Sequence, residues 1–320
     1  MRIFFTDKKY SQFFNLTIYF ETIKFGYHIQ KMTIIILLGF CYQQENLLSS
    51  SIQDLYRAYK EFSEYGTVYI LTDMDIYNKF YLSIIRYNQE SNNIERVLSH
   101  YQQYLCVNKQ DLKRNLRNIL QQHPLENILF YYTGHGKNNG ILLPDNNIIP
   151  FISIRNELTR YLDINKQLII ICDCCQGTNW SLPYIFDYEN KKISLNLVKD
   201  IVFSHHQILL FSSCQQHQES FSTYRDSLFT YFLIEHIKHM KTINIGPNFN
   251  ISSKSLRRIS DLMQKVQEKI DKRFLKQTIQ VYASHPIDDY LFSWLHPNND
   301  ISFTINKRGN IFTFKNSLNL

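Results

Sequence analysis

The chain has 320 residues, of which 44% are hydrophobic and 20% are charged, a composition typical of a soluble globular core rather than of a disordered protein. Its net charge of +7 is scattered along the sequence and forms no basic stripe, so neither nucleic acid nor a membrane is predicted as a partner. The apolar runs fall short of the ~20 residues that span a bilayer, and the six cysteines lack disulfide-type spacing, which favours a cytoplasmic protein.

We expect three regions along the chain. Residues 1–31 are aromatic and basic without a clear period, and form an N-terminal extension that is either disordered or an artefact of the gene prediction, with Met32 as an alternative start. Residues 32–296 carry the patterned segments of one folded domain. Residues 297–320 are Asn-rich and lose that pattern, so they are expected to form a C-terminal tail.

Apolar strands and amphipathic helices alternate through the folded region. Strands are predicted at 33–40, 67–72, 128–132, 168–171 and 207–212, and helices at 52–62, 111–121, 154–162, 229–240 and 256–274. Residues 73–106 are treated as a partly helical insertion, and the polar segment 184–206 as a loop. The alternation predicts an α/β fold of three layers, with a mostly parallel central sheet and helices on both of its faces.

Two of the predicted strands end at a reactive side chain beside glycine. Residues 128–132 lead into Thr-Gly-His-Gly, which contains His135, and residues 168–171 lead into Cys-Asp-Cys-Cys-Gln-Gly, which contains Cys175. Parallel sheets place their sites at the carboxyl ends of strands, so neighbouring strands would bring base and nucleophile together. This pattern indicates a cysteine hydrolase, with the Gly136 amide free to donate a hydrogen bond.

Two other interpretations compete with the catalytic one. A free cysteine at the end of an apolar strand is often simply buried. Cys172, Cys174 and Cys175 with a histidine are also possible zinc ligands, but structural zinc sites usually use pairs at CxxC-type spacing, and the sequence offers no second pair. We therefore predict no metal site.

The surrounding motifs resemble the caspase-type cysteine peptidases, and most of all the metacaspases. Residues 36–54 resemble the family's opening LLIG…L.GC.ND, 69–73 its I.VLTD, 131–136 its YYSGHG, 140–145 its GYLLP.D, 173–175 its DCC or DSC, 182–184 its LPY, 209–214 its MFSGC and 227–230 the G.FT of the wider group. The motifs are specific collectively rather than singly. The resemblance implies a caspase-like fold and a cysteine endopeptidase with a His135 and Cys175 dyad, acting on protein or peptide substrates.

The family's CHSG is shortened here to Cys-Gln-Gly, which makes the nucleophile ambiguous. Counting from Asp173 gives Cys175, whereas counting back from Leu182 without a gap gives Cys174. We favour Cys175, because it keeps an acidic residue two positions before the nucleophile and a glycine two positions after it. The resemblance also implies that the amides of Gly136 and Cys175 stabilise the oxyanion.

Asp173 is predicted to set the specificity. Metacaspases carry Asp at this position and accept Arg or Lys, whereas animal caspases carry Gln there and hold an aspartate, so the resemblance implies cleavage after Arg or Lys. A carboxylate suits a cationic side chain and repels an anionic one. The family's second pocket acid falls at His217, and Glu219 is the candidate substitute. The structural alternative is that Asp173 only caps a turn.

The segment between the cysteine-bearing strand and the next strand is a candidate for self-processing, at Lys191, Lys192 or Lys199. The chemistry requires no cofactor. Calcium is left open as an activator, for which the segment offers Asp187, Glu189 and Asp200.

A second function class is also open, a catalytically inactive caspase-fold scaffold or regulator. The shortened Cys-Gln-Gly and His217 motivate it, whereas the retained His135 and Cys175 oppose it. The motifs do not indicate an oligomeric state.

Overall fold

The computed structural model describes residues 33–42, 48, 50–63, 65–74, 101–124, 126–163, 166–190, 192–196, 204–223, 226–242, 254–273, 276–285, 301–305 and 312–316. The extension expected at 1–31 lies outside these residues. Within the expected C-terminal tail, strands β13 (Ile301–Ile305) and β14 (Phe312–Asn316) pair antiparallel with each other.

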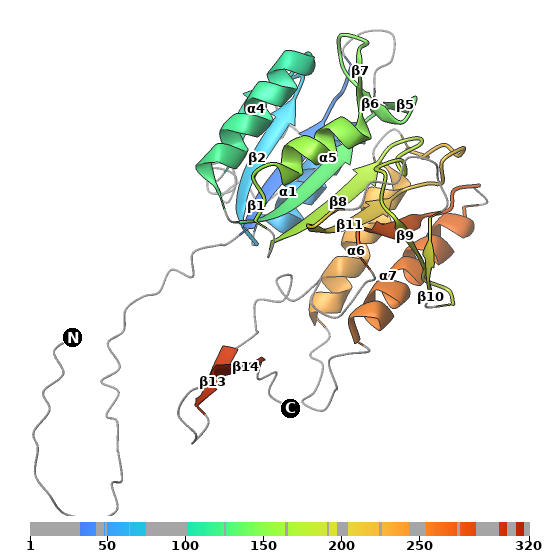
Figure 1. Cartoon of the computed structure of the whole chain (residues 1–320). Coiled ribbons are helices and arrows are strands. Elements are labelled where there is room, and N and C mark those ends of the chain that lie inside the picture. Colours follow the sequence, from blue (N-terminus) through green and yellow to red (C-terminus); the bar gives the residue numbers. More distant parts are fainter. Residues whose placement is uncertain are drawn as a thin grey trace, which may run out of the picture. The chain divides into compact units, whose positions relative to one another are not determined.

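A nine-stranded sheet forms the middle layer of the domain (Figure 1). Its strand order is β10-β9-β12-β11-β8-β4-β1-β2-β3. The parallel part contains β11 (Gln207–Ser212), β8 (Gln167–Asp173), β4 (Asn127–Thr133), β1 (Thr33–Gly39), β2 (Thr67–Thr72) and β3 (Tyr101–Leu105). The antiparallel edge contains β12 (Gln280–Ala283), β9 (Tyr184–Asp187) and β10 (Lys192–Leu195).

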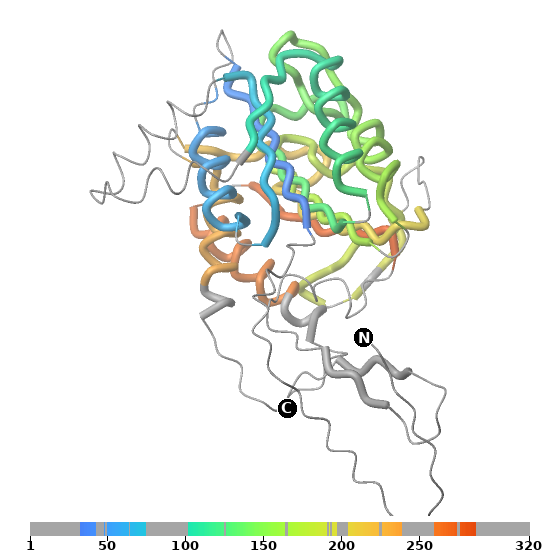
Figure 2. Tube along the Cα trace, turned by 90° about the vertical axis from the view of Figure 1, so that its left-hand side faces the viewer, coloured from blue at the N-terminus to red at the C-terminus, as the bar shows by residue number. Residues whose placement is uncertain are grey.

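Helices cover both faces of this sheet, as the two views in Figures 1 and 2 show. One face carries α1 (Ser50–Phe62), α6 (Leu228–Thr242) and α7 (Lys254–Asp271). The other carries α4 (Lys109–Gln122) and α5 (Phe151–Thr159). A small sheet of β5 (Gly136–Lys137), β6 (Gly140–Leu142) and β7 (Ile148–Pro150) follows β4. The predicted three-layer α/β fold with a mostly parallel central sheet is confirmed.

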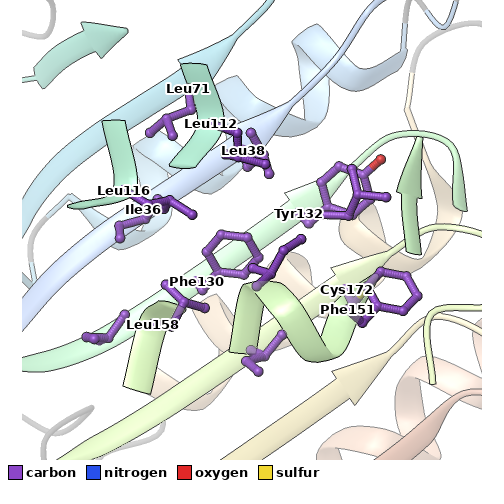
Figure 3. Close-up of a cluster of buried hydrophobic side chains, with 14 of the residues drawn as sticks. Ile36, Leu38, Leu71, Leu112, Leu116, Phe130, Tyr132, Phe151, Leu158 and Cys172 are labelled. Carbon is purple, nitrogen blue, oxygen red and sulfur yellow. The ribbon is translucent and has the colours of Figure 1, made fainter. Parts of the chain in front are cut away.

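Strand β1 shows why the sequence favours a central position in the sheet. All seven of its residues are buried, because alternate side chains face the two helical layers. Ile35 and Leu37 belong to the core beneath α1, α6 and α7. Ile36 and Leu38 belong to the opposite core, where they lie near Phe130 of β4 and the helices α4 and α5 (Figure 3).

The segment expected to be a loop at 184–206 is not wholly irregular. Its first part forms the hairpin β9–β10, which joins the sheet through β12. Strand β10 is the edge strand and β9 is only partly buried, so neither needs the continuous apolar run of the fully buried β1. In the expected insertion at 73–106, residues 101–105 form β3, and residues 75–100 lie outside the described part. Among the helices that the structure describes, none is both long and apolar enough to cross a membrane.

Candidate active site

Strands β4 and β8 are neighbours, and their carboxyl ends lie side by side. Thr133, the last residue of β4, is paired with Asp173, the last residue of β8. The two chains stay in contact beyond the strands, because the Gly134 amide donates to the Asp173 carbonyl at 3.3 Å. His135 and Cys175 therefore each follow their strand end by two residues.

Two glycines permit this close approach. A Cβ atom on Gly136 would lie 1.8 Å from the Cys175 carbonyl oxygen, so any side chain there would separate the two segments. Gly134 has a φ of +155°, and a Cβ atom on it would lie 2.6 Å from the Tyr132 hydroxyl. The Gly-His-Gly sequence is thus required by packing around His135.

The two candidate nucleophiles lie in different environments. Cys174 is 2% exposed, and its Sγ lies 3.5 Å from Cys172 Sγ. Burial, followed by the Cys172 thiol, raises the pKa of Cys174 well above its usual range. Cys175 is half-buried, whereas the five other cysteines are buried. Of the two residues, Cys175 is the more exposed.

Cys175 contacts the segment that follows β11. Its Sγ accepts a hydrogen bond from the Ser220 amide at 3.4 Å. Burial raises the pKa of the Cys175 thiol, the Ser220 amide opposes that shift, and the charges of Glu219 and Asp173 add to it. Glu219 itself is exposed. It therefore acts on the thiol through its charge.

Asp173 is buried and accepts hydrogen bonds from three side chains and one backbone amide. The Ser220 hydroxyl donates at 2.8 Å, the Thr230 hydroxyl at 2.6 Å and the Thr230 amide at 3.1 Å. The Ser227 hydroxyl donates as well. Thr230 lies in the first turn of α6, so the carboxylate also lies at the favourable end of that helix dipole.

A second buried carboxylate, Asp54 of α1, lies close to Asp173. Asp54 accepts from the Ser227 amide at 3.0 Å and from the Thr133 hydroxyl at 3.2 Å. Ser227 thus bridges the two acids, since its hydroxyl donates to Asp173 and its amide to Asp54. Burial, and next the charge of Asp173, raises the pKa of Asp54 well above its usual range.

Among the described residues, neither Asp54 nor Asp173 lies within ion-pair distance of a cationic side chain. Arg57, one helical turn along α1, is committed to Asp226 through two contacts of 2.8 and 3.1 Å. The described residues also contain no group of three or more His, Cys, Asp or Glu side chains suited to a metal ion.

Two residues of this region were not anticipated from the sequence. Asp54 lies on the buried face of α1 with Leu55, Ala58 and Phe62, and a carboxylate within a buried stripe is a signal that could have been followed. Tyr42 contacts His135 in three dimensions, but it lies in a polar turn 93 residues earlier. No local pattern connects the two.

Comparison with known proteins gives the family of the chain. A protein of Geobacter sulfurreducens with a solved structure is 13% identical, with 81% of this chain and 96% of that chain covered and a TM-score of 0.47. Caspase-1 from Spodoptera frugiperda is 12% identical, with 79% and 86% covered and a TM-score of 0.45. A search of curated proteins finds none that matches. The model of the caspase domain matches residues 32–291, and the chain therefore belongs to that family of cysteine-type peptidases, which act on protein substrates.

Proposed function

We propose that this protein is a cysteine endopeptidase of the metacaspase type, with Cys175 as nucleophile and His135 as general acid and base. The observation that supports this most directly is the register of Thr133 with Asp173, together with the packing of Gly136 against Cys175. Both residues follow neighbouring strand ends, which supports a pairing of the His135 imidazole with the half-buried Cys175 thiol. This pairing is what acyl transfer through a thioester requires.

The proposed reaction begins with transfer of the Cys175 thiol proton to the His135 imidazole. Sγ attacks the scissile carbonyl carbon, whose π electrons move onto the oxygen. Collapse of this intermediate breaks the C–N bond, and the departing amine takes the proton from His135. A water molecule then attacks the thioester and gives a proton to His135, after which Sγ leaves and is protonated again.

The oxyanion of each intermediate is assigned to the backbone amides of Gly136 and Cys175. Leu142 donates its amide to the His135 carbonyl at 3.0 Å, so Gly136 and Ile141 form a non-hydrogen-bonded pair of the β5–β6 ladder. The N–H of Gly136 therefore points away from β6. Losing one such donor typically costs ~10²–10³ in rate.

Cleavage after Arg or Lys is supported by the two buried acids. Asp54 and Asp173 share Ser227 and lack a cation among the described residues. A guanidinium or ammonium group entering here would gain charge-assisted hydrogen bonds, whereas an aspartate side chain would be repelled. We propose Asp54 as the second acid of this pocket, and Glu219 as an exposed acid near its entrance.

Binding of a basic side chain would require an exchange of partners at Asp173. Asp173 is 3% exposed, and its carboxylate accepts from the Ser220, Ser227 and Thr230 hydroxyls and from the Thr230 amide. Hydroxyl groups can rotate to accept from other groups, so an entering cation can replace them without loss of the fold. The substrate-free site is thus occupied by its own hydroxyls.

Self-processing remains a prediction. Lys192 is exposed at the start of the edge strand β10, where it lies opposite Asp187 in the register of the β9–β10 ladder. Lys191 and Lys199 lie outside the described residues. Asp187 holds the β9–β10 turn through Asn190 and Glu189, so of the acids considered for calcium it already has a structural role. Calcium activation is tested by adding calcium to the assay below.

The test uses fluorogenic peptides that end in Arg, Lys or Asp, with and without calcium. The variants Cys175→Ala and Cys174→Ala are a matched pair, since they remove adjacent thiols. We expect cleavage after Arg and Lys that is lost in Cys175→Ala and retained in Cys174→Ala. Loss only in Cys174→Ala would assign the nucleophile to the other cysteine, and cleavage after Asp would contradict the proposed pocket.

The inactive scaffold is the alternative outcome of the same experiment. A scaffold would cleave none of the peptides, and its Cys175 would react with iodoacetamide no faster than the buried Cys41. The contact of Cys175 with the neighbouring histidine segment supports the enzyme instead, because such a thiol should react faster than buried ones near neutral pH.

A further inference from the structure

The segment that carries His135 is held by two buried tyrosines, Tyr42 and Tyr132. The His135 amide donates to the Tyr42 hydroxyl at 2.9 Å, and the Tyr132 hydroxyl donates to the His135 carbonyl at 2.8 Å. The two hydroxyl oxygens lie 3.2 Å apart. Both polar groups of the His135 backbone are therefore fixed by one pair of side chains.

We propose that Tyr42 and Tyr132 are positioning residues, Tyr42 for the His135 imidazole and Tyr132 for the Gly136 amide. This inference rests on the proposed function of His135 and Gly136. The two roles are separate because the tyrosines bind opposite ends of the same residue.

Tyr42 acts on the imidazole in two ways. Its ring lies beside the His135 ring, with centroids 4.7 Å apart and an interplanar angle of 40°. Its hydroxyl accepts from the His135 amide and donates to the Leu142 carbonyl at 2.8 Å. Tyr42 therefore ties His135 to the end of β6 and limits the directions in which the imidazole can turn.

Tyr132 acts through the peptide plane that joins His135 to Gly136. In a trans peptide the C=O and the following N–H point in opposite directions. The His135 carbonyl is held by the Tyr132 hydroxyl and by the Leu142 amide, so the direction of the Gly136 N–H is fixed as well. That N–H is the proposed oxyanion donor.

Tyr42 is itself held in place by a buried acid. Its φ is +53°, a left-handed conformation that costs a residue with a side chain of the order of 1 kcal/mol. Asp73, just after β2, accepts from the Cys41 and Tyr42 amides at 2.9 and 2.8 Å. These bonds stabilise the turn that aims Tyr42 at His135.

The protonation state of the pair suits these roles. Burial raises the pKa of Tyr42 and of Tyr132 above the usual range of a phenol. Both hydroxyls thus keep their protons as pH varies, and they remain donors to the Leu142 and His135 carbonyls. Figure 3 shows Tyr132 in the buried cluster with Phe130 and Cys172, so its ring is anchored by the core.

The test compares Tyr42→Phe, Tyr42→Leu and Tyr132→Phe with the control Tyr188→Phe. Tyr188 is also buried and donates its hydroxyl to Gln267 at 3.3 Å, outside the site. We expect Tyr42→Phe and Tyr132→Phe to lower kcat about 10- to 100-fold with little change in KM. Tyr42→Leu should lower it further, because the ring contact is also lost, and Tyr188→Phe should keep the wild-type kcat.

A second readout does not require turnover. In protein labelled with 13C at histidine Cε1, the His135 signal is assigned through its loss in His135→Gln and compared between variants at one fixed pH. We expect a changed His135 chemical shift in Tyr42→Phe, because the ring contact and the amide hydrogen bond are altered, and no change in Tyr188→Phe. A kcat within twofold of wild type and an unchanged His135 chemical shift in Tyr42→Phe would overturn the role of Tyr42.

The two readouts separate this inference from the proposed function. If the wild-type protein cleaves no peptide, the proposed function fails, and the His135 chemical shift still decides whether Tyr42 positions the imidazole. If circular dichroism shows that Tyr42→Phe does not fold, the kcat of Tyr132→Phe is used as the test. A Tyr132→Phe variant that folds and retains the wild-type kcat would overturn the pairing of the two tyrosines.

Discussion

Asp73 and Asp173 lie at the carboxyl ends of two parallel strands, yet they are held by different kinds of donor. Asp73 accepts the backbone amides of Cys41 and Tyr42. Asp173 accepts mainly hydroxyl groups, from Ser220, Ser227 and Thr230. Asp173 also accepts the Thr230 amide at the start of α6. Hydroxyls can exchange for another donor, whereas a backbone amide cannot leave without loss of its turn. We therefore propose that a basic side chain binds Asp173 by replacing its hydroxyl donors, while the Thr230 amide stays in place.

The largest expected effect is on recognition. Asp173→Asn should reduce kcat/KM for an arginine substrate about 10²- to 10³-fold, because a neutral amide no longer attracts the guanidinium. The matched substrate ends in citrulline, which has the shape of arginine without its charge. Wild-type protein should strongly prefer arginine, and Asp173→Asn should lose that preference. If Asp173→Asn still preferred arginine over citrulline as strongly as wild type does, Asp173 would not determine the specificity.

Asp73→Asn should show the opposite pattern. The asparagine side chain has one acceptor oxygen in place of two, so the Cys41 or the Tyr42 amide loses its partner. We therefore expect the free energy of unfolding to fall by about 1–3 kcal/mol. Urea denaturation measures this loss. The preference for arginine over citrulline should remain, while kcat should fall through the displaced Tyr42. A lost preference with unchanged stability would contradict the structural role of Asp73.

Asp54 should make stability depend on pH. The pKa of Asp54 in the folded protein is raised above the ordinary value of 3.8. The protonated Asp54 side chain therefore favours the folded state at pH values below 3.8, and this contribution to stability is lost as pH rises through the raised pKa. Asp54→Asn should therefore be more stable than wild type at pH 7.5, by the order of 1 kcal/mol. The difference should shrink at pH 4. Urea denaturation at both pH values tests this, and a constant difference would show that Asp54 does not titrate as inferred.

The smallest expected effect is at Glu219. Its charge raises the pKa of the Cys175 thiol, so Glu219→Gln should lower that pKa and increase the thiolate fraction at pH 7. The rate of iodoacetamide labelling at Cys175 should rise a few-fold. The Glu189→Gln variant is the control, since Glu189 is an exposed acid in the β9–β10 turn. Equal labelling rates in wild type, Glu219→Gln and Glu189→Gln would show that the charge of Glu219 does not affect the Cys175 thiol.

The sequence predicts the central part of this molecule better than its edges. The apolar runs of β1, β4 and β8 mark strands buried on both faces, and parallel topology then brings their carboxyl ends together. Strands β9 and β10 escaped detection, because an edge hairpin stabilised by pairing with β12 needs no apolar run. Strand β12 was missed as well, although three of its four residues are buried. Longer strands buried on both faces carry their own signal, whereas short or partly exposed ones depend on their neighbours.

The site shows the same limit. His135, Cys175 and Asp173 follow predictable strands, so their neighbourhood could be expected from the sequence. The contacts of Tyr42 with His135 and of Asp54 with Ser227 join residues 93 and 173 positions apart. Such contacts arise from the packing of α1 and the β1 turn on the sheet, and no local periodicity encodes them.

The central claim is that Cys175 is the nucleophile of a site that accepts a basic side chain. A peptidyl chloromethyl ketone ending in arginine tests both parts at once, with an aspartyl probe as the matched comparison. We predict that mass spectrometry finds a single adduct on Cys175, formed at least about tenfold faster with the arginyl probe. An adduct on Cys174, or equal rates for the two probes, would contradict the account.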